Sequence, residues 1–200
     1  MKNTRLSAGL LACLLLAVGT VAPLAADTVS AGRSSGYGAS PPGNRDRIVR
    51  TGMTVLGGWA VANIATGIIG MLVAEDPAAR GFWEMNAMWN TVNLGLAGWS
   101  LYDLSRSGGV SADMDIEAYR EESHGLEKVL LFNAGLNFAY MAVGGWMWDR
   151  GMRGYGLPAA DISANRLRGW GQSMVLQGAF LLAFDLSMAR VVARDREGVR

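Results

Sequence analysis

The side chains with the clearest chemical potential in this sequence are carboxamides spaced along apolar stretches. Asn86, Asn90, Asn93 and Ala97 fall at offsets of 0, 4, 7 and 11, which places them on one face of an α-helix. A carboxamide carries two donors and an acceptor oxygen, and leaving these groups unpaired in hydrocarbon costs several kcal/mol. We therefore expect the amides to face one another as hydrogen-bonding groups between helices, each bond contributing about 0.6 to 2 kcal/mol.

A second interpretation gives the amides a role in transport. Amide groups that line a small polar cavity can replace part of a solute's hydration shell without imposing a charge. Asn63, Asn93 and Asn137 lie close to the middle of three apolar runs, and Gln177 lies near the middle of a fourth. The candidate polar core, or pore lining, consists of Asn63, Asn86, Asn90, Asn93, Asn133, Asn137, Tyr140, Gln177 and Asp185.

The second and third apolar runs share a pattern. A shift of 47 residues places Asn133, Asn137, Tyr140 and Gly144 on the offsets occupied by the Asn86 face. Consecutive spans run in opposite directions, so a faint inverted repeat is one interpretation. Chance is the other, because Gly and Ala are common in this chain.

Ionisable groups are scarce within the apolar runs. Asp185 lies eight residues after Gln177 on the same helix face, and it is the first carboxylate to consider if protons or cations move; the alternative is an ion pair with Arg190 or a neighbour. Glu84 is expected to reach the lipid headgroups. His124 is expected in a solvated loop. Because it is the only histidine, a haem held by two histidines of one chain is excluded. No nucleophile and base stand at a recognisable spacing, so we expect no enzyme, metal or other cofactor.

Four apolar runs predict an all-α fold, an antiparallel bundle of four transmembrane helices. Runs of 20 to 23 residues cover roughly 30 Å at 1.5 Å per residue, the thickness of a bilayer's hydrocarbon core. A water-soluble bundle needs a charged outer face on every helix, which these runs lack. The net charge of +1 gives no reason to expect a nucleic-acid partner. The predicted spans are residues 53–74, 82–104, 129–148 and 170–192.

The first 26 residues predict an export signal. Lys2 and Arg5 precede the apolar run LLACLLLAVGTVA, and small residues follow where a peptidase would cut after Ala26. Cleavage would remove Cys13, the only cysteine, although LLAC also loosely resembles a lipoprotein acceptor site. The remaining segments are a flexible extracytoplasmic leader at 27–50, the helical bundle at 51–193 and a charged tail at 194–200.

Loop charges orient the predicted bundle. Residues 105–128 are acidic, include a short helix predicted over Ala112–Ser123 and ended by Gly125, and suit the outside of the cell. Residues 149–169 carry four arginines and suit the cytoplasm. Both agree with an exported N-terminus, and the arginines of the tail oppose it. We expect a bacterial inner-membrane protein whose N-terminus is extracytoplasmic.

Small residues recur every four positions on the first and fourth spans. Such stripes allow helix backbones to approach closely, either within one chain or between copies. Tryptophans, Trp59 among them, lie mostly near the ends of the spans, as interfacial anchors do. The stripes are Gly58, Ala62, Thr66 and Gly70 on the first span and Ala179, Ala183 and Ser187 on the fourth.

The stretches GGWAVANIATG, MWNTVNLGLAGW and FNAGLNFAYMAVGGW carry a family resemblance over about residues 50–192. In them the chain resembles small uncharacterised families of bacterial four-helix membrane proteins. The resemblance implies the fold and brings no catalytic residues. We expect a non-enzymatic membrane protein of structural or accessory type, which meets the lipid bilayer and associates with copies of itself or a membrane-protein partner. The alternative is a small-solute or ion pathway lined by the amides, in an oligomer.

Overall fold

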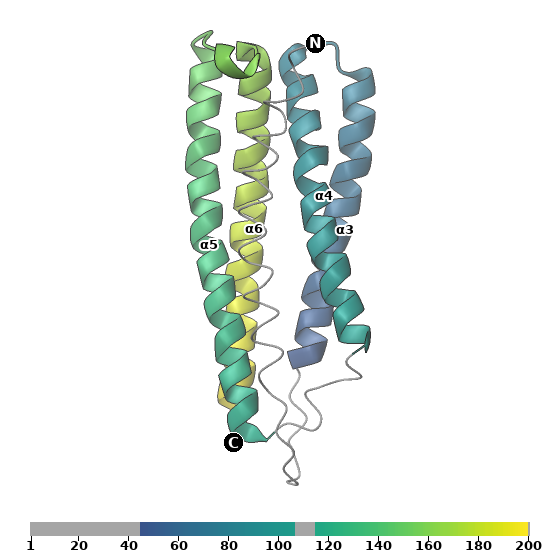
Figure 1. Ribbon diagram of the computed structural model, residues 1–200, viewed down its shortest axis with the longest axis vertical. Helices are drawn as coiled ribbons and strands as arrows, with labels where there is room; N and C mark the ends of the chain where they lie inside the picture. Colours follow the sequence, from purple (N-terminus) through teal and green to yellow (C-terminus); the bar gives the residue numbers. More distant parts are fainter. Residues whose placement is uncertain (1–44, 107–114, 200) are drawn as a thin grey trace.

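Four long helices make up the part of the chain that the computed structural model describes, residues 45–106 and 115–199 (Figure 1). They are α3 (Arg45–Val73), α4 (Pro77–Arg106), α5 (Ile116–Met152) and α6 (Ala164–Gly198). A 3-10 turn, η2 (Pro158–Ala160), lies in the α5–α6 connection, and these described ranges contain no strand beyond one isolated bridge. The all-α fold predicted from the sequence is confirmed.

The helices extend beyond the predicted apolar runs. α3 begins at Arg45, so residues 45–50, which the sequence assigned to the leader, are helical. The prediction of a separate helix ending at Gly125 is wrong. α5 begins at Ile116, after Asp115 has accepted a hydrogen bond from the Ala118 N–H at 2.7 Å, and continues through Gly125 to Met152. The predicted export signal at 1–26 and residues 27–44 of the leader lie outside the described residues.

Contacts with α3 and α6 hold the early turns of α5. Arg45 of α3 pairs with Glu122 at 3.2 Å, and Arg196 of α6 pairs with Glu127 at 2.8 Å. Gly125 lies between these two contacts, and a glycine in a helix interior costs about 1 kcal/mol relative to alanine. The two ion pairs offset this cost. Tyr119 of α5 also donates a hydrogen bond to Asp195 of α6. We call the residues of these three contacts the end cluster, and they are Arg45, Tyr119, Glu122, Glu127, Asp195 and Arg196.

Burial changes the acidity of two members of the end cluster. Burial raises the pKa of Glu122, and the charge of Arg45 lowers that pKa in part. Burial, followed by the hydrogen bond to Asp195 and the charge of Asp195, raises the pKa of Tyr119 to about 12. Tyr119 therefore remains a neutral donor to Asp195 at neutral pH.

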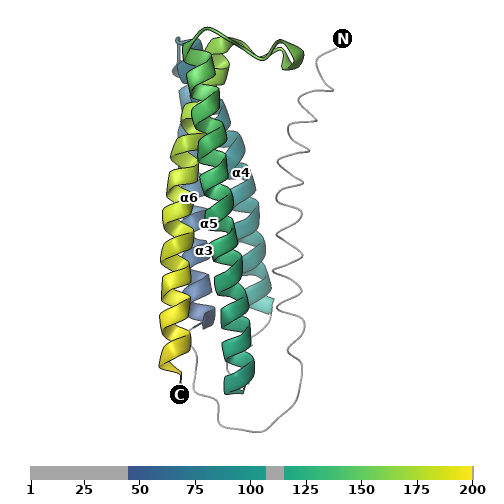
Figure 2. The same ribbon diagram turned by 90° about the vertical axis from the view of Figure 1, so that its left-hand side faces the viewer.

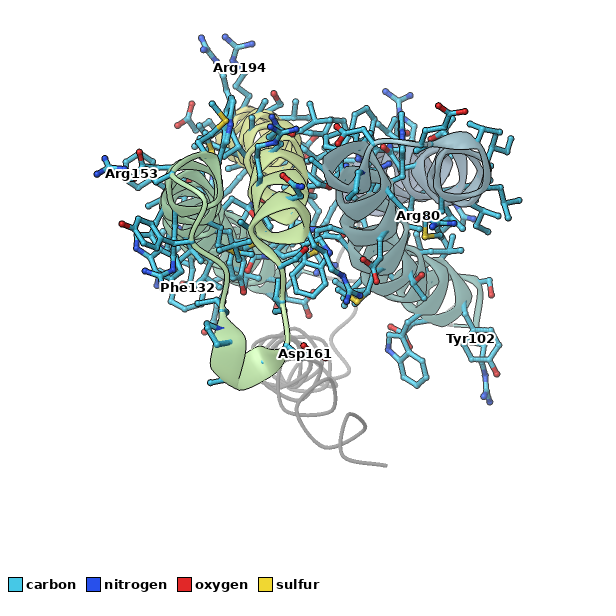
Figure 3. The ribbon with its side chains drawn as sticks, turned by 90° about the horizontal axis from the view of Figure 1, so that it is seen from above. Arg80, Tyr102, Phe132, Arg153, Asp161 and Arg194 are labelled. Carbon is cyan, nitrogen blue, oxygen red and sulfur yellow. The ribbon has the colours of Figure 1, made fainter. Side chains whose placement is uncertain are left out.

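The helices alternate in direction and stand in a row in the order α3, α4, α6, α5 (Figures 1 and 3). α6 packs extensively on α4 and on α5, whereas α3 packs mainly on α4 and meets α6 over a smaller area. Figure 2 shows α5 and α6 in front of α3 and α4. α6 lies between α4 and α5 and also reaches α3, so its side chains contact residues of all three other helices.

Glycine sets the distance between the closely packed helices. A methyl group at Gly144 of α5 would lie 2.9 Å from the carbonyl oxygen of Gly171 on α6. A methyl group at Gly81 of α4 would lie 2.9 Å from the carbonyl oxygen of Arg166 on α6. Such distances leave no room for a side chain, so the backbones meet directly at these points.

Aromatic rings separate α3 from α6. The rings of Trp59 and Phe180 stack with their centroids 3.8 Å apart and their planes at 7°. Of the predicted small-residue stripes, only Gly70 is buried, against the ring of Trp83. The other members lie exposed on the outer surfaces of α3 and α6, and they are Gly58, Ala62, Thr66, Ala179, Ala183 and Ser187.

Polar and apolar side chains are distributed in the opposite sense to a water-soluble bundle. Leu72, Trp99 and Phe138 are among the most exposed large apolar residues, at 77%, 70% and 68% of their surface. Tyr102 and Phe132 likewise point away from the row (Figure 3). By length and composition, α3, α5 and α6 are apolar enough to cross a membrane. α4 falls short, because its asparagines lower its average hydropathy.

Candidate functional site

The candidate site is a group of amides where α3, α4 and α6 meet, and all of them are buried except Asn63, which is half-buried. Gln177 of α6 stands at its centre, and its side chain is fully buried. Its Nε2 donates to Oδ1 of Asn86 and, at 3.4 Å, to Oδ1 of Asn63. Its Oε1 accepts from the indole Nε1 of Trp59 at 3.0 Å. Both ends of the Gln177 amide are therefore satisfied by protein groups from α3 and α4.

The other two amides continue from Asn86 along α4. Asn86 Nδ2 donates to the backbone oxygen of Asn63 at 3.2 Å, which ties α4 to α3. Asn90 Nδ2 donates to the backbone oxygen of Asn86 at 2.8 Å, and Asn93 Nδ2 donates to Oδ1 of Asn90 at 3.3 Å. All three α4 asparagines are buried. We call this group the amide cluster, and its members are Trp59, Asn63, Asn86, Asn90, Asn93 and Gln177.

A separate polar contact joins α5 to α6. Asn137 Nδ2 donates to Oδ2 of Asp185 at 2.7 Å. The two residues retain only 5% and 6% of their surface exposed. Arg190, the partner that the sequence suggested for Asp185, is exposed and makes no ion pair with it. We call Asn137 and Asp185 the carboxyl pair.

Hydrogen bonds thus divide the candidate residues into two groups, in place of the single network expected of Asn63, Asn93 and Asn137. The order of the helices explains the division, because α5 lies at the other end of the row from α3 except near the end cluster, where Arg45 of α3 reaches Glu122 (Figure 3). Asn133 is half-buried one turn before Asn137. Tyr140 is half-buried, and its ring lies edge-on to Trp89 with the centroids 5.0 Å apart.

Two charged residues lie in surroundings that the sequence did not predict. Glu84 binds Arg166 through both carboxylate oxygens, one bond being 2.8 Å, and accepts from the indole of Trp170 at 3.1 Å. This hydrogen-bonded pairing with Glu84 raises the pKa of Arg166. His124 belongs to α5 and not to a loop, and it contacts Glu127 at 3.5 Å as well as Arg196.

Trp59 is the member of the candidate site that the sequence did not indicate. The sequence indicated an interfacial anchor, whereas its indole N–H binds Gln177 in the interior. The available signal was its position four residues before Asn63, which places both on the same face of α3. The indole of Trp59 is a hydrogen-bond donor without an acceptor, so it can bind the acceptor oxygen of an amide such as Gln177.

The amide cluster is a hydrogen-bonded contact between packed helices. One surface groove runs between α3 and α6, with Val55, Phe184 and Val191 in its walls, and another lies beside Glu84 and Arg166. No member of the amide cluster or carboxyl pair lines either groove. Across the described ranges, no three or more His, Cys, Asp or Glu side chains come together as metal ligands.

Residues 55–186 match the family model described as a Family of unknown function (DUF6992), and since this is more than half of the 200 residues, the chain belongs to that family. The matched segment contains the whole amide cluster and the carboxyl pair, and it leaves out three members of the end cluster, Arg45, Asp195 and Arg196. No curated protein and no solved structure matches the chain.

Proposed function

We propose that this chain is an integral membrane protein of structural or accessory type, without enzymatic activity, whose four helices all cross a bilayer. The burial of the amides, together with large exposed apolar side chains on every helix, carries the proposal. Water-soluble proteins rarely expose apolar patches of this extent. In a bilayer, the outward side chains meet lipid, and the buried amides satisfy one another where no water is present.

α4 is included among the spans because its asparagines do not face outward. Its exposed positions from 91 to 99 are Thr91, Leu94, Gly95, Leu96, Gly98 and Trp99. The hydroxyl of Thr91 donates to the backbone oxygen of Ala87 at 3.0 Å, so its hydrogen bond is formed within α4 and needs no water. The outer face of α4 is therefore as compatible with lipid as the outer faces of its neighbours.

The proposed location is a bacterial inner membrane, with residues 1–26 as the export signal and the start of α3 outside the cytoplasm. The arginines of the tail were the objection to this orientation. Arg196 pairs with Glu127 and contacts His124 in the early turns of α5, so this arginine of the tail lies beside the acidic segment that is proposed to face the outside.

Membrane fractionation and reporter fusions test this proposal. The full-length chain should remain in the membrane pellet after a carbonate wash. Fusions after Asp76 and Arg153 should report the cytoplasm, and a fusion at Glu117 should report the outside. A chain released by carbonate would contradict membrane insertion, and a cytoplasmic signal from Glu117 would contradict the orientation.

Association between copies is part of the accessory role. The exposed small residues of α3 and α6 support it, because they allow a helix of a second chain to approach closely within the bilayer. A second candidate function is an ion or proton pathway. The carboxyl pair favours it, because ionisable groups buried in membrane spans commonly mark such pathways.

A further inference from the structure

Asp185 is a carboxyl group placed deep among apolar helices. It lies 21 residues into the 35-residue α6, two turns beyond Gln177, and it is buried. Its one hydrogen-bond partner within the described residues is Asn137. The apolar cluster of Leu130, Met188, Ala189 and Val192 lies between it and the end cluster. This apolar cluster covers the side of the carboxyl group that faces the end cluster.

No described cation faces Asp185 from any helix packed against α6. The sequence contains no charged residue from 51 to 73 on α3, from 85 to 102 on α4 or from 129 to 148 on α5. On α6 itself, the adjacent charges are Arg168, which pairs with Asp76 near the other end, and the exposed Arg190. The nearest other titratable group along α5 is Tyr140, whose ring packs on Trp89. An ionised Asp185 would thus be a buried charge without compensation, which is costly in hydrocarbon.

Asn137 is suited to both protonation states of this carboxyl group. Its Nδ2 donates to Asp185 Oδ2 in the structure, as an ionised carboxylate requires. Once the carboxyl is protonated, a turn of the amide presents Asn137 Oδ1, which can accept from the new O–H group. The hydrogen bond between α5 and α6 is therefore retained when one proton is added or removed.

We propose that Asp185 and Asn137 form a proton-binding site between α5 and α6, in which Asp185 binds and releases one proton and Asn137 exchanges donor for acceptor. The ligand is the proton, because hard metal cations require more oxygen ligands than one carboxyl and one amide supply. Binding adds an O–H bond to Asp185 and needs no other reactant. The inference rests on the proposed location of the four helices in a bilayer.

Infrared difference spectroscopy on the full-length chain in lipid nanodiscs tests the site. As pH is changed, a band of a protonated carboxyl C=O should appear and disappear reversibly, and its frequency should shift in heavy water. Asp185→Asn should abolish the band, whereas Asp103→Asn, at an exposed position of α4, should leave it unchanged. Asn137→Leu should keep the band but move its frequency and its midpoint, because the hydrogen-bond partner is lost.

Two results would overturn the proton-binding site. The first is an Asp185 that stays in one protonation state at every pH at which the wild-type chain remains folded. The second is loss of the band on addition of sodium at constant pH, which would identify a cation site. If Asp185→Asn does not fold, the same titration on wild-type chain with isotope-labelled aspartate gives the answer. A carbonate wash of membranes tests the location separately, so failure of insertion is distinguishable from failure of the site.

Discussion

Replacing Gly144 with alanine tests the closest packing between α5 and α6. The new methyl group would lie 2.9 Å from the carbonyl oxygen of Gly171, 2.9 Å from Cβ of Met174 and 3.1 Å from the backbone nitrogen of Val175. Two of these three neighbours are backbone atoms, which cannot rotate away. Gly145, the next residue of α5, has no such neighbour within 4 Å and is a matched control.

The two substitutions share one effect and differ in another. Alanine in place of glycine favours a helix interior by about 1 kcal/mol, and this gain applies at both positions. Only Gly144→Ala adds overpacking, which typically costs about 1 to 3 kcal/mol. We therefore expect the free energy of unfolding of Gly144→Ala to be about 1 to 3 kcal/mol below that of Gly145→Ala, since the shared gain cancels in the comparison.

Reversible unfolding in mixed detergent micelles, followed by circular dichroism, measures this difference. Gly171→Ala should be destabilised in the same way, because its methyl group would meet α5 from the other side. Equal stability of Gly144→Ala and Gly145→Ala would refute the close approach of the two backbones.

The remaining predictions concern the buried and the charged contacts. Asn86→Leu and Gln177→Leu should each cost about 1 to 3 kcal/mol by leaving a partner unpaired, and the double variant should cost less than their sum. Asn137→Leu should couple less strongly with either variant than these two couple with each other, because the two groups share α6 but no hydrogen bond, and equal coupling would contradict the two separate groups. Arg45→Ala should raise the pKa of Glu122 further, because burial already raises it and Arg45 opposes this. When the pKa of Glu122 is higher in the folded than in the unfolded chain, protonated Glu122 stabilises the folded state below the unfolded pKa, and this stabilisation is lost as pH rises through the folded pKa. The unfolding midpoint of Arg45→Ala in detergent should therefore fall with increasing pH. Glu122→Gln in the Arg45→Ala background should remove this pH dependence.

The apolar runs located the helices because apolar length is a local property of the sequence. Each predicted run falls within one helix, apart from Ala74, which lies one residue beyond α3. The ends were not predictable in the same way. α5 begins at Ile116 and continues through Gly125, so the short helix and the run at 129–148, which were predicted as separate, form one helix, and contacts with distant residues such as Arg45 and Arg196 stabilise its first turns. Such contacts leave no periodic signal in the segment itself.

The helical period identified which amides are buried and not which amides meet. Asn86, Asn90 and Asn93 share a face by spacing alone, and that face is buried. The partner of Asn137 depends on which helix stands beside α5, and this order follows from glycine contacts and aromatic spacers between distant residues. The sequence therefore led us to expect that Asn137 would join the other amides, whereas the structure places it with Asp185.

The position of α6 inside the row accounts for the shared pattern of the second and third apolar runs. The Asn86 face of α4 meets Gln177, and the Asn137 face of α5 meets Asp185, so both faces pack on the same helix. Gln177 and Asp185 are eight residues apart, about 12 Å along a helix that contains no proline. A rotation of α6 that breaks the carboxyl pair would also displace Gln177 from Asn86. The amide cluster thereby stabilises the orientation of α6 in which Asp185 meets Asn137, and the structural role of the amides supports the proton-binding site.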